Sequence, residues 1–140
     1  MDFFYEPLEH TADAGVRVWG GSWEELLRNS ARALYDTITD WRSIAAGREE
    51  HLFEMEGRDA AEVLVGWLGE LLFLFDSRRL LFREFEFEAC RPERIRVRMR
   101  GEAFDVRRHP FKTEVKAVTH HKATVREEGG RWSAEVIFDL

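Results

Sequence analysis

Residues 60–75 read AAEVLVGWLGELLFLF, and this stretch decides how the rest of the chain must fold. Asp59 stands in front of it and is a good helix N-cap, because a carboxylate accepts bonds from the free N–H groups of the first turn. The run is too short to span a bilayer and is interrupted by Glu62 and Glu70. We therefore predict a helix that is buried on more than one side, because its apolar residues cover most of the circumference: Val63, Leu64, Trp67, Leu68, Leu71, Leu72 and Phe75.

A second helix is predicted upstream, over about residues 22–40. Gly20 and Gly21 break the preceding segment, and Ser22 followed by Glu25 has the spacing of a capping box. Apolar residues then recur at helical spacing, which indicates an amphipathic helix with one face in the core: Trp23, Leu27, Ala31, Leu34 and Ile38.

The remaining segments alternate between apolar and polar residues, which is typical of half-buried strands. A turn at Glu128-Gly129-Gly130 separates the last two of them. Two long helices among such strands predict a single α+β domain over residues 1–140, with a mostly antiparallel sheet that has one face covered by helices. The strands are expected near 3–10, 14–19, 49–56, 81–87, 94–100, 113–119, 122–127 and 131–138.

The composition limits the function. The net charge of -6 argues against a broad nucleic-acid surface, which needs clustered Lys and Arg. Cys90 is the only cysteine, so neither an intramolecular disulfide nor a cysteine-rich zinc site is available, and a reducing cytoplasm is the expected compartment. Residues 1–6 lack the pattern of a signal peptide. Phosphate-binding loops and nucleophile motifs are also missing, so catalytic residues are not expected.

Both ends of the chain carry aspartates where strands begin or end. Asp13 lies in HTADAG (residues 10–15), and Asp139 in VIFDL (residues 136–140), where the α-carboxylate of Leu140 adds a second negative group. Oxygen ligands of this kind suit Ca²⁺, Mg²⁺ or Mn²⁺. The alternatives are a turn aspartate that bonds its own backbone and a solvated chain end. A nearby His10 or His121 would favour Mn²⁺ or Zn²⁺ instead.

A third polar element is EVKAVTHH, residues 114–121. In a regular strand, Lys116 and His120 lie on one face and His121 on the other, so all three reach one site only if a bulge intervenes. Glu70, on the apolar helix, needs a partner because an unpaired buried charge is costly.

The order of four segments, residues 10–15, 67–72, 114–121 and 136–140, resembles the archease family, small metal-binding partners of RtcB-type RNA ligases. The resemblance covers essentially the whole chain and implies the same fold class. It also implies metal ligands at Asp13 and Asp139, with the terminal residue Leu140 as a further ligand.

The resemblance further implies functional roles for Lys116 and His121. The family usually has an aromatic residue where His120 stands. We therefore expect a non-catalytic, divalent-metal-binding activator that helps an RtcB-type ligase take up guanylate and turn over in tRNA splicing or RNA repair. A membrane or direct nucleic-acid partner is not expected, and the sequence leaves the oligomeric state open.

Three other functions remain open. A metal-dependent hydrolase would use a cation at Asp13 and Asp139, with His10 or His121 as base, and needs a substrate pocket beside them. A general chaperone or scaffold needs an exposed apolar patch, expected near Trp19, Trp23 or Trp41. Direct RNA binding would rest on the arginines at alternate positions from 94 to 100, which equally suit a solvated strand face.

Overall fold

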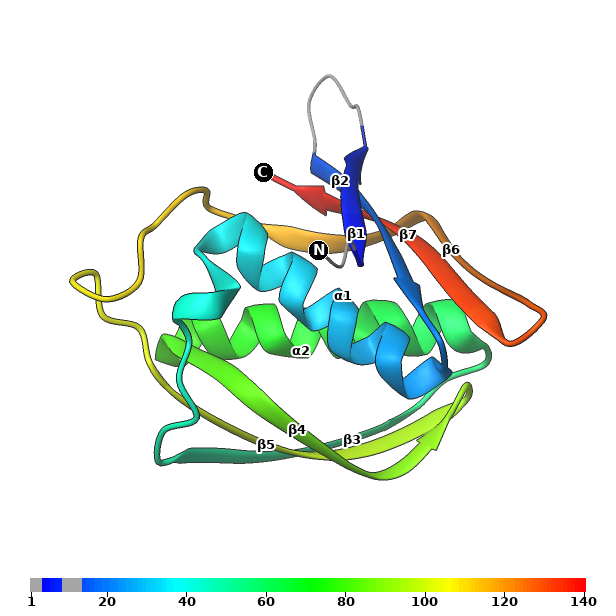
Figure 1. Ribbon diagram of the computed structural model, residues 1–140, viewed down its shortest axis with the longest axis horizontal. Helices are drawn as coiled ribbons and strands as arrows, with labels where there is room; N and C mark the ends of the chain where they lie inside the picture. The colour runs from blue at the N-terminus through cyan, green and yellow to red at the C-terminus, as the bar shows by residue number, and fades with distance from the viewer. Residues whose placement is uncertain (1–3, 9–13) are drawn as a thin grey trace.

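A computed structural model of the protein describes residues 4–8 and 14–140 (Figure 1). Two long helices, a 3₁₀ helix and seven strands occur in this part of the chain. In order they are β1 (Tyr5–Leu8), β2 (Ala14–Gly20), α1 (Trp23–Ile38), η1 (Trp41–Ser43), β3 (Glu49–Glu56), α2 (Ala60–Arg78), β4 (Leu80–Arg91), β5 (Arg94–Ala103), β6 (Ala117–Glu128) and β7 (Arg131–Asp139).

The strands form two antiparallel sheets with the helices between them. One sheet has the order β1-β2-β7-β6 and the other β3-β5-β4, and all neighbouring strands are antiparallel. Figure 1 shows α1 and α2 between the two sheets. The predicted α+β class with antiparallel strands and two long helices is confirmed. One sheet was expected and the structure has two, each with one face against the helices (Figure 1), because a helix that is apolar on most sides needs cover from two layers.

The central helix forms as its sequence predicts. The carboxylate of Asp59 accepts from the N–H of Glu62 at 2.9 Å, which caps α2. The helix continues to Arg78, three residues past the predicted end. It stops at Arg79, which adopts a left-handed conformation with φ 54° and bonds back to the carbonyls of Leu74 and Phe75.

The two helices are joined through the core. Trp67 on α2 is fully buried, and its indole Nε1 donates to the carbonyl of Leu27 on α1 at 3.0 Å. Leu68 and Leu71 are also buried, at 1% and 0% exposure. Within the described residues, neither helix is long and apolar enough to cross a lipid bilayer.

The last third of the chain differs from the prediction. The expected strands 113–119 and 122–127 are one strand, β6, and residues 113–116 precede it. Its pairing with β7 shifts between Thr119 and Thr124, and Lys122 has a positive φ of 60°. The four residues 120–123 thus face a single position of β7, which makes a bulge larger than the usual two residues against one. The predicted turn at residues 128–130 is confirmed, with positive φ at Gly129 and Gly130.

Candidate functional site

The C-terminal end of β7 lies between the first residues of β2 and β6. Ala14 in β2 pairs with Phe138, and Ala117 in β6 pairs with Asp139. The backbone N–H of Lys116 donates to the carbonyl oxygen of Asp139 at 2.7 Å. Three segments that are far apart in sequence therefore meet at one edge of the four-stranded sheet. We call this place the C-terminal edge, formed by Ala14, Lys116, Asp139 and Leu140.

The chain end at this edge is anchored. Val136 and Phe138 are fully buried at 0% exposure, whereas Asp139 and Leu140 are exposed. The strand thus holds the last two residues at the surface while burying those before them. Two negative groups, the side chain of Asp139 and the α-carboxylate of Leu140, lie within two residues of each other. They are the oxygen donors that hard divalent cations prefer.

Two of the expected site residues, His10 and Asp13, lie outside the described residues. The expected closeness of Asp13 to Asp139 therefore stays a prediction. Ala14, which follows Asp13 in the sequence, pairs with Phe138, which precedes Asp139. Residues 4–8 and 14–140 contain no group of three or more His, Cys, Asp or Glu side chains that could hold a metal.

Lys116 joins the edge through its backbone, and its side chain is exposed. His120 and His121 are exposed in the bulge of β6 at residues 120–123. The alternation of faces expected from a regular strand therefore does not apply to them. Within the described part of the chain, no hydrogen bond or ion pair joins either imidazole ring to Asp139 or Lys116. The structure therefore brings the backbones of Lys116 and Asp139 together and leaves the role of His121 a prediction.

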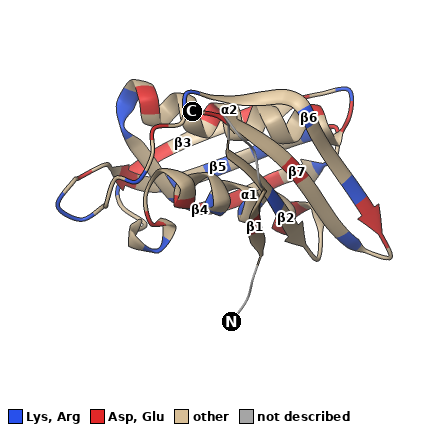
Figure 2. Ribbon diagram, turned by 90° about the horizontal axis from the view of Figure 1, so that it is seen from above, with Lys and Arg blue, Asp and Glu red and all other residues tan. Residues whose placement is uncertain are grey.

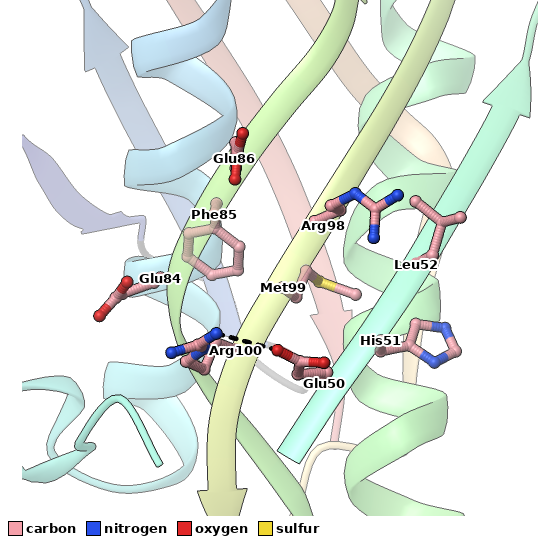
Figure 3. A pocket seen from close by; sticks show the side chains of 9 residues that line it. All are labelled: Glu50, His51, Leu52, Glu84, Phe85, Glu86, Arg98, Met99 and Arg100. Carbon is pink, nitrogen blue, oxygen red and sulfur yellow. Dashed lines mark hydrogen bonds and ion pairs between the residues drawn. The ribbon is translucent and has the colours of Figure 1, made fainter. Parts of the chain in front are cut away.

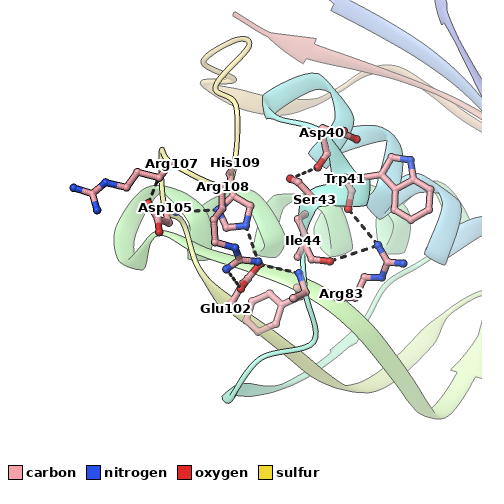
Figure 4. Close-up of polar contacts among 12 residues, drawn as sticks. Asp40, Trp41, Ser43, Ile44, Arg83, Glu102, Asp105, Arg107, Arg108 and His109 are labelled. Atoms are coloured by element: carbon pink, nitrogen blue, oxygen red, sulfur yellow. Dashed lines mark hydrogen bonds and ion pairs between the residues drawn. The ribbon is translucent and has the colours of Figure 1, made fainter.

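The connection from β5 to β6, residues 104–116, fixes the position of Lys116, and its first anchor is Glu102 (Figure 4). The carboxylate of Glu102 accepts from Arg108 Nη2 at 2.9 Å, from the backbone N–H of Ala45 at 2.8 Å and from His109 Nε2 at 2.8 Å. His109 is fully buried, and its Nδ1 accepts from the N–H of Asp105. The proton of this imidazole is therefore on Nε2, which donates to Glu102.

These contacts make the side chain of Glu102 a stronger acid than an ordinary glutamate. Burial raises the pKa of Glu102, but the hydrogen bonds from Arg108, Ala45 and His109 outweigh it and lower the pKa to about 2. The group therefore stays ionised at neutral pH and holds the connection against the 44–46 segment.

A second anchor lies closer to Lys116. The N–H of Lys112 donates to the carbonyl of Ile38 at 2.8 Å, and its Nζ donates to the carbonyl of Asp36 at 3.1 Å. Val115, directly before Lys116, is 2% exposed. The connection is thus tied to the end of α1 and to the core. Sequence reasoning missed both anchors, because neither follows a helical or strand period.

Glu70 has the partner that its position demands. Its Oε2 lies 3.0 Å from Nε2 of His51 on β3, and both side chains are 23% exposed. The predicted need for a partner is confirmed. The pair joins α2 to the three-stranded sheet, and neither residue belongs to the C-terminal edge.

The arginines of β5 form a ladder with glutamates on the neighbouring strands. A hollow of about 450 Å³ lies on this sheet, and Figure 3 shows Arg98 and Arg100 among the side chains that line it. Arg94 pairs with Glu54 at 2.7 Å, and Arg96 with Glu88 at 2.7 Å. Figure 2 shows acidic and basic residues interspersed along the ribbon. Glutamates neutralise the stripe from Arg94 to Arg100, so it offers no support for RNA binding.

The apolar patch expected for a general chaperone is not formed by the three tryptophans. Trp23 is 5% exposed, and its indole N–H donates to the carbonyl of Arg91 at 2.9 Å. Trp19 and Trp41 are half-buried. The exposed large apolar side chains of the described residues belong to separate elements and loops: Leu52, Phe73, Val106, Phe111 and Leu140.

Comparison with known proteins gives a consistent result. Residues 5–140 match the family model described as the Archease protein family (MTH1598/TM1083). A protein archease of Methanopyrus kandleri is 45% identical over 139 residues, which cover 97% of this chain and 99% of the relative. A protein archease of Pyrococcus furiosus is 37% identical over 140 residues, which cover 97% of this chain and 98% of the relative.

Two solved structures have the same fold. The solution structure of protein 1598 of Methanobacterium thermoautotrophicum superposes with a TM-score of 0.78 at 33% identity, covering 98% of this chain and 99% of the other. The crystal structure of an archease, possible chaperone, from Thermotoga maritima superposes with a TM-score of 0.64 at 23% identity and 96% coverage of both chains.

Proposed function

Because this chain belongs to the archease family, we propose that it is a non-catalytic, divalent-metal-binding protein that activates an RtcB-type RNA ligase. In this role it promotes guanylylation and multiple turnover of the ligase during tRNA splicing or RNA repair in the cytoplasm. The observation that carries the proposal is the C-terminal edge, where Lys116 and Asp139 are joined by a hydrogen bond although 23 positions separate them.

The residues at this edge fit a hard divalent cation such as Ca²⁺, Mg²⁺ or Mn²⁺. The proposed ligands are Asp13, Asp139 and the α-carboxylate of Leu140, and all of them are oxygen donors. A bound cation would supply positive charge to attract phosphate oxygens or carboxylates of the partner. Exposure of Asp139 and Leu140 leaves this end of the sheet open to the partner.

Lys116 contributes a positive charge beside these carboxylates. Its backbone is held by Asp139 and its side chain is exposed, so the ammonium group is available to an anionic group on the ligase. We assign His10 and His121 supporting roles in the same interaction with the ligase. None of these steps requires the chain itself to form a covalent bond with RNA.

The test is a multiple-turnover RNA-joining assay with an RtcB-type ligase from the same source. Wild-type protein should raise turnover without joining RNA alone. Asp139→Asn and Lys116→Ala should remove the stimulation. Glu128→Gln and Arg126→Ala are matched controls, because both residues are exposed on β6 away from the C-terminal edge and should keep it. Equal stimulation by wild type and both edge variants would refute the proposal.

The archease of Thermotoga maritima is a possible chaperone, and that role is the main alternative for this chain. A general chaperone would suppress aggregation of unrelated unfolded proteins, whereas the proposed activator acts on one ligase. A light-scattering assay with an unrelated client distinguishes the two.

A further inference from the structure

Three arginines from three separate elements surround the ring of Trp41. The guanidinium carbons of Arg32 on α1, Arg42 on η1 and Arg83 on β4 lie 5.0, 4.9 and 5.1 Å from the ring centroid. We call this group the Trp41 arginine cluster. Each contact is a cation–π interaction, which is attractive. All three guanidinium groups surround the same ring, so the distances between them are no more than about one Debye length, roughly 10 Å at 0.1 M salt. Their positive charges therefore repel one another.

The cluster differs from the arginine ladder of β5 because no carboxylate pairs with its guanidinium groups, whereas Asp36 and Asp40 accept from the backbone N–H groups of Trp41 and Arg42. Among residues 4–8 and 14–140, none of its three guanidinium groups has a carboxylate oxygen within 4.0 Å, whereas Arg94, Arg96, Arg98 and Arg100 each have at least one. Figure 4 shows Arg83 beside Trp41, where its Nη1 reaches only the carbonyls of Trp41 and Ile44, at 3.5 and 3.4 Å.

The environment of Arg32 disfavours its positive charge, although the nearby carboxylate of Glu25 offsets part of this effect. Burial lowers the pKa of the Arg32 guanidinium, and the neighbouring charges of Arg83 and Arg28 lower it further. An anion bound among these groups would relieve that repulsion. The net charge of -6 disfavours a broad polyanion surface, but it does not oppose a local site of this kind.

A basic cleft continues from the cluster along α1. Its volume is about 630 Å³, and Arg28, Arg32 and Arg131 line it, with Glu25 as the acidic residue. Arg28 is paired with Glu24 at 3.0 Å, so Arg32 and Arg131 supply the positive charge there, which Glu25 offsets in part. Arg32 belongs to both the cleft and the cluster. The basic surface is thus long enough for more than one anionic group.

We propose that Arg32, Arg42 and Arg83 bind phosphate groups of a ligand that carries several of them, either a nucleoside triphosphate or an RNA backbone. Guanidinium groups match the geometry of phosphate oxygens and bind them in pairs. The ring of Trp41 already carries three guanidinium groups, so it orients the arginines and is not a platform for base stacking. This site lies apart from the C-terminal edge and does not depend on the ligase.

The test measures binding of two probes at low salt and without metal: GTP by calorimetry, and a short fluorescein-labelled single-stranded RNA by polarisation. Arg32→Gln, Arg42→Gln and Arg83→Gln should each weaken binding about tenfold, the usual loss of a charge-assisted hydrogen bond. For RNA, each substitution should also reduce the slope of log affinity against log salt by about 0.7. Arg100→Gln is the matched control, because it removes the same charge from the neutralised ladder and should leave binding unchanged.

The results also identify the source of the phosphates. Binding of RNA alone identifies the ligand as a nucleic-acid backbone, binding of GTP alone identifies it as a nucleotide, and either supports the site. Arg42 is exposed, so its variant keeps the test valid if Arg32→Gln unfolds. The proposal fails if neither probe binds, if Arg100→Gln weakens binding equally, or if poly-glutamate binds as tightly as RNA with the same dependence on the cluster.

Discussion

The N–H of Lys116 and the carbonyl of Asp139 are joined by a 2.7 Å hydrogen bond, so the start of β6 and the end of the chain form one structural unit. The side chains of both residues are exposed. This relationship allows function to be changed at the C-terminal edge without disturbing the core, because a side-chain substitution leaves the backbone bond in place.

Asp139→Asn should weaken binding of Ca²⁺, Mg²⁺ or Mn²⁺ while leaving the melting temperature of the metal-free protein unchanged. The substitution removes a negative oxygen ligand from an exposed side chain that has no hydrogen-bond or ion-pair partner among the described residues. Isothermal calorimetry measures the binding and circular dichroism the stability. Glu128→Gln is the control of equal charge change. Unaltered cation affinity in Asp139→Asn would exclude this residue as a ligand.

Asp13 and Asp139 should share the cation. A crystal structure with a bound divalent ion would test this directly, and carboxylates more than roughly 10 Å apart would contradict it, because that separation is far beyond a common first shell of ligands. Removal of Leu140 should weaken cation binding too, since it moves the α-carboxylate by one residue.

Leu68→Ala and Leu71→Ala should each cost about 2–5 kcal/mol of unfolding free energy, because both side chains are buried on α2 and truncation leaves a cavity. Phe73→Ala on the same helix is the control. Phe73 is 60% exposed, so its loss should stay within about 0.5 kcal/mol. Urea melts measure all three, and equal small losses would show that the helix is less buried than described.

The core was the most predictable part of the molecule because its signals are local. The apolar circumference of residues 60–75, the cap at Asp59 and the alternation in the strands need only neighbouring residues to be recognised. The division into two sheets was not predictable from such patterns, because strand pairing joins distant segments. The bulge at residues 120–123 was missed for the same reason, since it exists only relative to the register of β7.

The candidate site was predicted in part. The terminal apolar strand correctly indicated that Asp139 is held in place, and the position of Lys116 beside it follows from pairing that the sequence does not display. Glu102 and His109 were overlooked although they fix the connection to Lys116. The hydrogen bond between their side chains connects β5 to the loop that follows it, and no helical or strand periodicity in the sequence indicates such a contact.

Glu102 should make the protein sensitive to acid. Its folded-state pKa of about 2 lies below the usual value of 4.5, so its contribution to stability is present above about pH 4.5 and is lost as the pH falls toward 2. Glu102→Gln should be less stable than wild type at pH 7 and lose less stability across that window. Urea melts at several pH values test the slope, and parallel slopes for both proteins would contradict the assignment.

The strongest test of the functional class is phosphoester hydrolysis by the purified protein with added Mn²⁺. We expect no activity, because in the proposed function Lys116 and the carboxylates of the C-terminal edge act on the ligase and not on a substrate. In parallel, Lys116→Ala should abolish stimulation of the ligase while Arg126→Ala, on the same strand, retains it. Hydrolysis that depends on Asp13 would make the protein a metal-dependent hydrolase. Loss of ligase stimulation in both Lys116→Ala and Arg126→Ala would indicate that stimulation requires positive charge in general and not Lys116 in particular. Retained stimulation in Lys116→Ala would remove this residue from the interaction with the ligase.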